Sequence, residues 1–422
     1  MGALTALTSD PPRQAHRRRR SGLRAAAAFA GPAFLVSVGY MDPGNWGTDL
    51  AAGSRYGYQL LWVLVAANVA ALFLQRLSAK LGIVTGKHLA QLIGEHIATG
   101  PRRAYAGLAL TAMLVTETAE FLGVVVALRL LLRLPLLAAV ALGGILVLGL
   151  LALGARRARP LERAVFALLG TVAAAYLVEL WLAPPPVGGV LRGLAPTLPS
   201  GSLPIALGIL GAVVMPHNLY LHSGLVLDRR GDGSDPRGVL RRCTVESGIA
   251  LNLALGVNAA ILLMAATTFF GLGADVSSLG EAHATLTPLV GSAAALAFGL
   301  ALLAAGLASC ITGGIATQYV IDGLIRTRHL RSPLLRRLIA IVPATIVLAA
   351  GTPEIMALVW SQVVLALTLP AVIIPLLLLV RSPRVMRQHA IGRPALVTGI
   401  LMTATLIGLN AIAVWQVLVG GG

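Results

Sequence analysis

The sequence predicts an all-α polytopic membrane protein built from two inverted repeats of five helices and one additional helix. Three observations support this prediction. The 422-residue chain is 57% hydrophobic and only 12% charged, which is too apolar for a water-soluble domain. Apolar runs of about 20 residues, long enough to cross a bilayer, can be placed at eleven positions. The first and the sixth run are both interrupted near their middles.

The eleven predicted spans follow one another with short connections. They lie near residues 25–53, 58–84, 104–129, 134–154, 161–183, 203–226, 243–271, 289–325, 335–350, 355–380 and 392–419. Spans 1 and 6 each open a set of five, so the second set crosses the membrane in the opposite orientation to the first. Interruptions at matching positions of two halves indicate inverted repeats with a binding site near the bilayer midplane.

We therefore expect one membrane domain over residues 23–419 and no soluble domain. Repeat one covers about 23–183, repeat two covers about 203–380, and the additional helix covers about 392–419. Residues 1–22 are expected to form a disordered, basic segment. A cleaved signal peptide is the alternative for this region, but the apolar run continues through span 1 without a convincing cleavage site.

The formal net charge of +17 does not indicate nucleic-acid binding. The arginines are not gathered in one soluble segment but recur in every second loop, near residues 17–20, 102–103, 156–159, 229–242, 326–331 and 381–393. The intervening loops are nearly free of arginine. The positive-inside rule then predicts a cytoplasmic N-terminus and, with eleven spans, a C-terminus outside.

Polar residues within the spans are the functional candidates, because polar groups are costly at bilayer depth. Span 1 contains Asp42, Pro43, Gly44 and Asn45 in succession. The other two segments are "TETAE" in span 3, with Glu117 and Glu120, and "AVVMPHNLYLH" in span 6, with Met215, Pro216, His217 and Asn218. Glu117 and Glu120 are three residues apart and share a helix face.

The interrupted spans predict a cation site. Pro43 and Pro216 break the helices and free backbone carbonyls, notably that of Ala212. Asp42 would add a charged oxygen and Asn45 a neutral one, and an anionic substrate would be repelled by Asp42. A site made only of oxygen ligands would suit Mg²⁺ or Ca²⁺. The thioether of Met215 shifts the preference toward Mn²⁺, Fe²⁺ or Cd²⁺.

Several of these residues also have structural interpretations. A methionine in a membrane helix commonly fills a gap in the core, and only the position of Met215 at the break favours a ligand. His217 can serve either in packing or in proton transfer, and His222 is interpreted as structural. Glu281 and His283 are interpreted as the start of an element before span 8, not as a metal cluster.

Five segments resemble the Nramp family of proton-coupled divalent metal transporters. They are "GYMDPGNWGTDLAAGS", "TETAEFLG", "AVVMPHNLYLHS", "GIATQYVIDGL" and "SQVVLALTLPAVIIPLLL". The resemblance implies a LeuT-like fold. It also implies metal binding by Asp42, Asn45, the Ala212 carbonyl and Met215, with Gln362 nearby. Finally, it implies a proton route through Asp42, Glu117, Glu120, His217, Arg336 and Arg337. The chain departs from the family pattern at Glu117, where aspartate is usual, and at Thr368, where glutamine is frequent.

The expected function is secondary active import of divalent transition metal ions, Mn²⁺ or Fe²⁺, together with protons, by alternating access. The expected location is a bacterial-type inner membrane, and neither a cofactor nor an oligomer is required. One alternative is a LeuT-like symporter of amino acids or amines with Na⁺. A membrane-embedded hydrolase is another, but the spans show neither a nucleophile with its base nor an HExxH motif.

Overall fold

The computed structural model describes residues 32–154, 170, 184–229, 235–270, 278–281, 292–325 and 333–419. Predicted span 5, residues 1–22 and His283 lie outside this part of the chain. The described residues form helices joined by short turns, in keeping with the predicted all-α class. Their order is α2 Pro32–Gly39, α3 Pro43–Tyr56, α4 Leu61–Thr85, α5 Leu89–His96, α6 Thr99–Leu132, α7 Leu136–Gly154, α9 Val187–Gly193, α10 Leu203–Val214, α11 Pro216–Leu225, α12 Pro236–Thr268, α14 Ser292–Val320, α15 Pro333–Ala349, α16 Glu354–Arg381, α17 Pro383–Met386 and α18 Arg393–Val419.

Six segments among the described helices are long and apolar enough to cross a membrane. They are Leu61–Thr85, Leu203–Leu225, Pro236–Thr268, Leu296–Ile325, Glu354–Arg381 and Arg393–Gln416. α6 and α7 meet at a sharp bend of 117° and together would make a seventh span. In length and composition, these segments correspond to predicted spans 2, 6, 7, 8, 10 and 11. Predicted span 9 corresponds to α15, whose described apolar part, Leu338–Ala349, is shorter.

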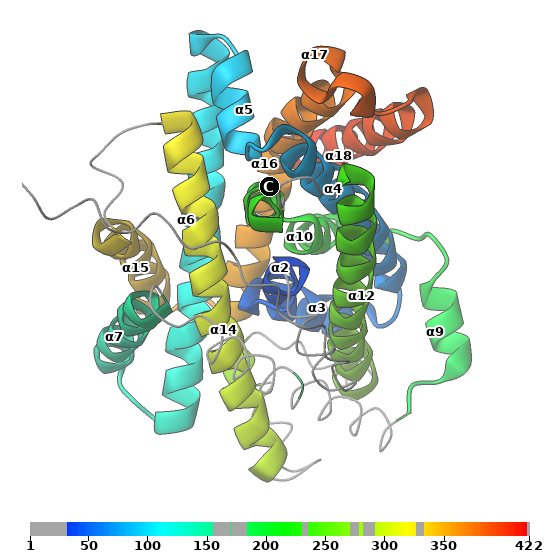
Figure 1. The fold of residues 1–422 in the computed structure, drawn as a ribbon. Helices are drawn as coiled ribbons and strands as arrows, with labels where there is room; N and C mark the ends of the chain where they lie inside the picture. Colours follow the sequence, from blue (N-terminus) through cyan, green and yellow to red (C-terminus); the bar gives the residue numbers. More distant parts are fainter. Residues whose placement is uncertain are drawn as a thin grey trace, which may run out of the picture.

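The two interrupted spans lie at the centre of the helix bundle. α2, α3 and α10 occupy the middle of the view in Figure 1, between α14 and α12. α6 packs along α14, and α16 packs against both α10 and α3. α7 and α15 lie on one flank and α9 on the other. The interrupted helices are therefore surrounded by continuous ones, which is where unwound backbone is tolerated in a membrane.

The helix breaks lie where proline and glycine predicted them. In span 1, α2 ends at Gly39 and α3 begins at Pro43, so three residues separate the half-helices. In span 6, α10 ends at Val214 and α11 begins at Pro216, so Met215 alone separates them. Each proline is the first residue of its second half-helix, where its missing N–H removes no helical hydrogen bond. Both spans are thus helix pairs, as the sequence indicated.

Candidate functional site

The first break is organised by Asp42. Its carboxylate caps α3, because Oδ1 accepts a hydrogen bond from the backbone N–H of Asn45 at 2.8 Å. The Asn45 side-chain amide donates to the same oxygen at 3.0 Å. Only 2% of Asp42 and 1% of Asn45 is exposed. The break thus holds a buried carboxylate and a side-chain amide next to each other, where sequence reasoning placed two metal ligands.

The second break offers a carbonyl and a sulfur. Pro216 has no N–H to donate to the carbonyl of Ala212 four residues earlier, so this carbonyl loses its helical partner. Met215 is fully buried, and its φ of 44° is a left-handed backbone angle that L-residues rarely adopt. The Asn218 amide donates to the Met215 sulfur at 3.2 Å. The break therefore holds the methionine in one buried position.

Close packing at three glycines brings the two breaks together with α16. A Cβ atom on Gly39, at the end of α2, would lie 2.8 Å from the Asn218 amide nitrogen of α11. A Cβ atom on Gly44 would lie 1.9 Å from the Gln362 amide nitrogen and 3.2 Å from Asp42 Oδ1. A Cβ atom on Gly211, beside Ala212, would lie 1.9 Å from the Gln362 carbonyl oxygen. The predicted ligand residues thus come from three elements that meet in one buried region.

Sequence reasoning missed Asn258 of α12. Its amide nitrogen donates to the Tyr40 carbonyl at 2.9 Å and to Asn45 Oδ1 at 3.3 Å, which ties α12 to the first break. A polar residue in the middle of predicted span 7 was the available signal. Asn218 was quoted in its motif without a role, yet it contacts Met215 and packs against Gly39.

Three amides at this site have buried oxygens without a hydrogen-bond donor among the described residues. They are Asn218 Oδ1, Asn258 Oδ1 and Gln362 Oε1. Leaving a buried acceptor unpaired costs about 1–3 kcal/mol, so such groups in a native structure call for an explanation. Amide oxygens are typical cation ligands. Their presence beside Asp42 is what a site for a dehydrated cation requires.

Asp49 is a further buried carboxylate that sequence reasoning passed over. It lies on α3 seven residues after Asp42, and 1% of it is exposed. Its Oδ2 has no hydrogen-bond partner within the described part of the chain. The spacing of two helical turns places it on the face of α3 that begins at Asp42. An acid inside a predicted span was the signal that could have identified it.

The proton-route candidates lie on α6 and the helices packed against it. Glu117 accepts a hydrogen bond of 2.6 Å from Thr317 on α14. Glu120 is fully buried, and a Cβ atom on Gly313 would lie 2.7 Å from its Oε2. His217 Nδ1 lies 3.3 Å from Thr116 Oγ1, which connects α11 to α6 next to Glu117. Glu117 also lines a cavity of about 260 Å³ that reaches Ile339 of α15.

The remaining residues singled out from the sequence are Arg336, Arg337, His222, Thr368 and Glu281. Arg336 and Arg337 belong to α15, but their side chains lie outside the described part of the structure. His222 Nδ1 lies 2.7 Å from Gln75 Oε1, and Gln75 donates to the Tyr40 hydroxyl at 2.8 Å, in keeping with its structural interpretation. Thr368 donates to the Leu365 carbonyl of its own helix at 2.8 Å. Glu281 lies in a short helical stretch that begins at Leu279, as expected.

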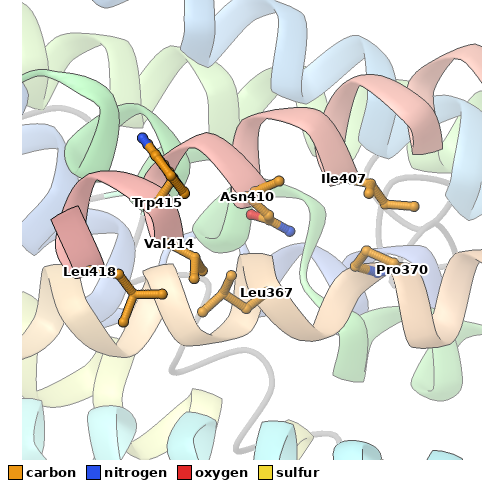
Figure 2. A pocket seen from close by; sticks show the side chains of 8 residues that line it. Leu367, Pro370, Ile407, Asn410, Val414, Trp415 and Leu418 are labelled. Carbon is orange, nitrogen blue, oxygen red and sulfur yellow. The ribbon is translucent and has the colours of Figure 1, made fainter.

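An apolar groove between α16 and α18 is separate from this site. Figure 2 shows Leu367 of α16 near Val414 and Leu418 of α18, and the lining also includes Pro370, Ile407 and Trp415. Asn410 on α18 donates to the Ala366 carbonyl at 3.0 Å and is the polar side chain of the lining. α18 is the least buried of the six candidate spans, at 22%. The groove therefore belongs to the outer surface of the bundle and not to the central polar region.

The donor set differs from that of a resident metal centre. Among the described residues there is no group of three or more His, Cys, Asp or Glu side chains that could hold a metal ion. The central region instead combines one carboxylate with amides, a freed carbonyl and a thioether. Few charges and several neutral donors favour weak, reversible cation binding. Fold and site together define a membrane transport protein with a buried polar region between two interrupted helices.

The chain belongs to the Nramp family. Residues 33–416 match the family described as "Natural resistance-associated macrophage protein-like". The chain is 42% identical over 404 residues to the divalent metal cation transporter MntH of Burkholderia ambifaria, covering 94% of this chain and 90% of that protein. It is 43% identical over 385 residues to MntH of Aeromonas hydrophila, covering 90% of this chain and 94% of that protein. The predicted family is confirmed.

Solved structures support the same fold. The Eremococcus coleocola manganese transporter in complex with an aromatic bis-isothiourea substituted compound has a TM-score of 0.78 and 34% identity, covering 94% of this chain and 88% of that one. Mhp1, a nucleobase-cation-symport-1 family transporter in a closed conformation, has a TM-score of 0.59 and 17% identity. The match covers 91% of this chain and 90% of that one. The Mhp1 likeness concerns the fold alone. The predicted LeuT-like fold is confirmed.

Proposed function

We propose that this protein imports divalent transition metal ions through the membrane by secondary active transport. The observation that carries the proposal is the meeting of two interrupted helices around one buried carboxylate, Asp42. A dehydrated cation would be bound there by Asp42, Asn45, the Ala212 carbonyl and Met215, with Gln362 from α16. Because both breaks belong to central helices, a change in their tilt exposes the site to one side of the membrane or the other.

Met215 supports a transition metal as the cargo. Its sulfur is a soft ligand that Mn²⁺, Fe²⁺ and Cd²⁺ accept more readily than Mg²⁺ or Ca²⁺. The relatives named above carry divalent metal cations or manganese by their own names. The alternative of an amino acid or amine symporter receives no support from these relatives. It would also require a substrate carboxylate to approach Asp42.

Protons are proposed as the coupling ion. Glu117, Glu120 and His217 are buried, His217 lies next to Thr116 of α6, and Glu117 lines the cavity that reaches α15. Ile339 of α15 lines that cavity, and Arg336 and Arg337 precede it on the same helix. In this proposal Asp42 binds the metal and also releases a proton to these residues. Glu117 reaches Thr317 across the interface with α14, which gives its longer side chain a defined position.

The proposed location is a bacterial-type inner membrane, with the arginine-rich loops and the N-terminus in the cytoplasm. The C-terminus would then lie outside after eleven spans. The chain is proposed to act without a cofactor, and a single copy contains all of the proposed ligands.

The central test is Mn²⁺ uptake into proteoliposomes driven by a pH gradient. Asp42→Ala should abolish uptake, because it removes the only charged ligand. The matched control is Asp235→Ala, because Asp235 also caps a helix with its carboxylate but lies in an exposed turn before α12. Undiminished uptake by Asp42→Ala would refute the proposed site.

Proton coupling has its own test. Internal pH and Mn²⁺ uptake are recorded together for Glu117→Gln and Glu120→Gln. Each variant should lower the number of protons that enter with each metal ion. Glu246→Gln is the control. Glu246 forms an ion pair with Arg229 at 2.7 Å, and this pair lies away from the central site. Unchanged proton entry in both α6 variants would remove them from the route and leave the metal site intact.

A further inference from the structure

A polar cavity of about 230 Å³ lies away from the central site, where α4, α5 and α17 meet. Its polar lining comprises Thr85, Lys87, Glu95, His96, Arg384 and Arg387. Thr85 is the last residue of α4, Lys87 follows two residues later, and Glu95 and His96 are the last two residues of α5. Arg384 and Arg387 belong to the connection after α16. The cavity therefore joins two connections that are far apart in the sequence.

The charges of this cavity are not balanced. Lys87 Nζ contacts the two carboxylate oxygens of Glu95 at 2.8 and 2.7 Å, so these two charges cancel. The guanidinium groups of Arg384 and Arg387 form no hydrogen bond or ion pair with any described residue. His96 Nδ1 lies 3.0 Å from the Leu92 carbonyl, within its own helix. Two arginine charges thus remain uncompensated in one cavity.

Arg387 is also held in an unusual backbone conformation. Its φ of 51° and ψ of −128° are rarely adopted by a residue with a side chain. Such a conformation costs about 1–3 kcal/mol and persists where the surrounding structure requires it, often at ligand clamps. A glycine at this position would adopt the same backbone conformation without this cost. In this conformation the Arg387 side chain lines the cavity.

We propose that this cavity binds the phosphate group of an anionic phospholipid. Two guanidinium groups match the oxygens of a phosphate with paired hydrogen bonds, which a single lysine cannot provide. The cavity lies just beyond the ends of α4 at Thr85 and α16 at Arg381, which are both candidate membrane spans. Headgroup phosphates lie at this depth, and basic pockets between span ends are suited to them. Inorganic phosphate in solution is the other source of the same chemistry.

Lipid binding here would take place beside the ends of two helices. Lys87 follows α4, and Arg384 and Arg387 follow α16; the two helices contact each other and share α10 as a neighbour. A phosphate bound by Arg384 and Arg387 would lie on the α16 side of the cavity, beside the Lys87–Glu95 ion pair on the α4 side.

The test compares lipid retention by the purified full-length protein. Native mass spectrometry measures bound phosphatidylglycerol and phosphatidylcholine, with inorganic phosphate as a competitor. The variant is Arg384→Gln with Arg387→Gln. The control is Arg381→Gln with Arg393→Gln, which removes the same charge from neighbouring positions that do not line the cavity. Thermal unfolding in phosphatidylcholine confirms that both double variants fold.

Wild type and control should retain phosphatidylglycerol, and the Arg384/Arg387 variant should bind it about tenfold more weakly because charge-assisted hydrogen bonds are lost. Phosphatidylcholine should not be retained by any of the three. Equal retention of phosphatidylglycerol by variant and control would overturn the site. Displacement of the lipid by low concentrations of inorganic phosphate in the wild type alone would keep phosphate recognition and overturn the lipid as its source.

Discussion

The two helix breaks differ in how their unwound backbone is stabilised. In the first break, three residues separate α2 from α3, and the Asp42 carboxylate caps the second half-helix at 2.8 Å. In the second break, Met215 alone separates α10 from α11, no side chain caps α11, and the backbone adopts a φ of 44°. The first break is thus stabilised by polar contacts, whereas the second keeps its shape under backbone strain.

This difference explains which ligand each break supplies. A capping carboxylate is already held by N–H groups, so Asp42 presents a charge in a fixed place without strain elsewhere. In the one-residue break, Met215 itself occupies the N-cap position of α11 and makes no capping hydrogen bond, so its side chain lies directly at the gap that follows the freed Ala212 carbonyl. In the proposed site, one break would therefore provide the charge and the other the soft ligand.

The largest expected effect separates charge from capping at the first break. Asn caps helices about as well as Asp, so Asp42→Asn should leave the thermal midpoint of unfolding nearly unchanged. Removing the only charged ligand should weaken Mn²⁺ binding by about a hundredfold, or about 2.7 kcal/mol. Isothermal titration calorimetry measures the affinity. A large loss of stability with unchanged affinity would show that Asp42 serves only the helix.

The second prediction compares the packing of the two breaks against Gln362. In Gly211→Ala the new Cβ would lie 1.9 Å from the Gln362 carbonyl oxygen. This backbone carbonyl cannot move without shifting α16. In Gly44→Ala the new Cβ would meet the Gln362 side-chain amide, which can rotate. Gly211→Ala should therefore lower the unfolding free energy by about 2 kcal/mol. Gly44→Ala should cost less stability but displace Gln362 and reduce Mn²⁺ affinity, and the same thermal and calorimetric measurements distinguish the two.

A third prediction concerns Asn258, which contacts only the first break. Asn258→Ala removes the donor to the Tyr40 carbonyl and to Asn45 Oδ1. Mn²⁺ affinity should fall by about tenfold, because the lost buried hydrogen bonds are worth about 1–2 kcal/mol. Asn252→Ala is the control, since Asn252 lies on the exposed face of the same helix. Equal affinities of the two variants would remove Asn258 from the site.

The smallest expected effect separates strain from ligation at Met215. Both Met215→Ala and Met215→Gly remove the sulfur, so both should reduce the preference for Mn²⁺ over Mg²⁺ in competition uptake. Glycine tolerates positive φ, so Met215→Gly should be more stable than Met215→Ala by about 1 kcal/mol. Equal stabilities would show that the break is not strained. A wild type that takes up Mg²⁺ as well as Mn²⁺ would instead remove the role of the sulfur.

Much of the fold was accessible from the sequence because bilayer thickness fixes the length of an apolar run. The breaks at Pro43 and Pro216 were placed correctly because proline has no N–H to donate. Two buried residues around the breaks escaped prediction, Asn258 and Asp49. A single polar residue in a long apolar helix has no local partner, so its role depends on which helix lies opposite. Predicted span 9, residues 335–350, corresponds to α15, Pro333–Ala349.

The sequence by itself determined that this chain crosses a membrane many times and that two of its helices are interrupted, because both properties depend on local chemistry alone. Only the tertiary structure decided which amides face the breaks, that Glu117 meets Thr317 200 residues away, and that Arg384 and Arg387 share a cavity with Lys87. These contacts join residues that no sequence period relates. They depend on close helix packing at glycines such as Gly44 and Gly211, which brings α3, α10 and α16 together.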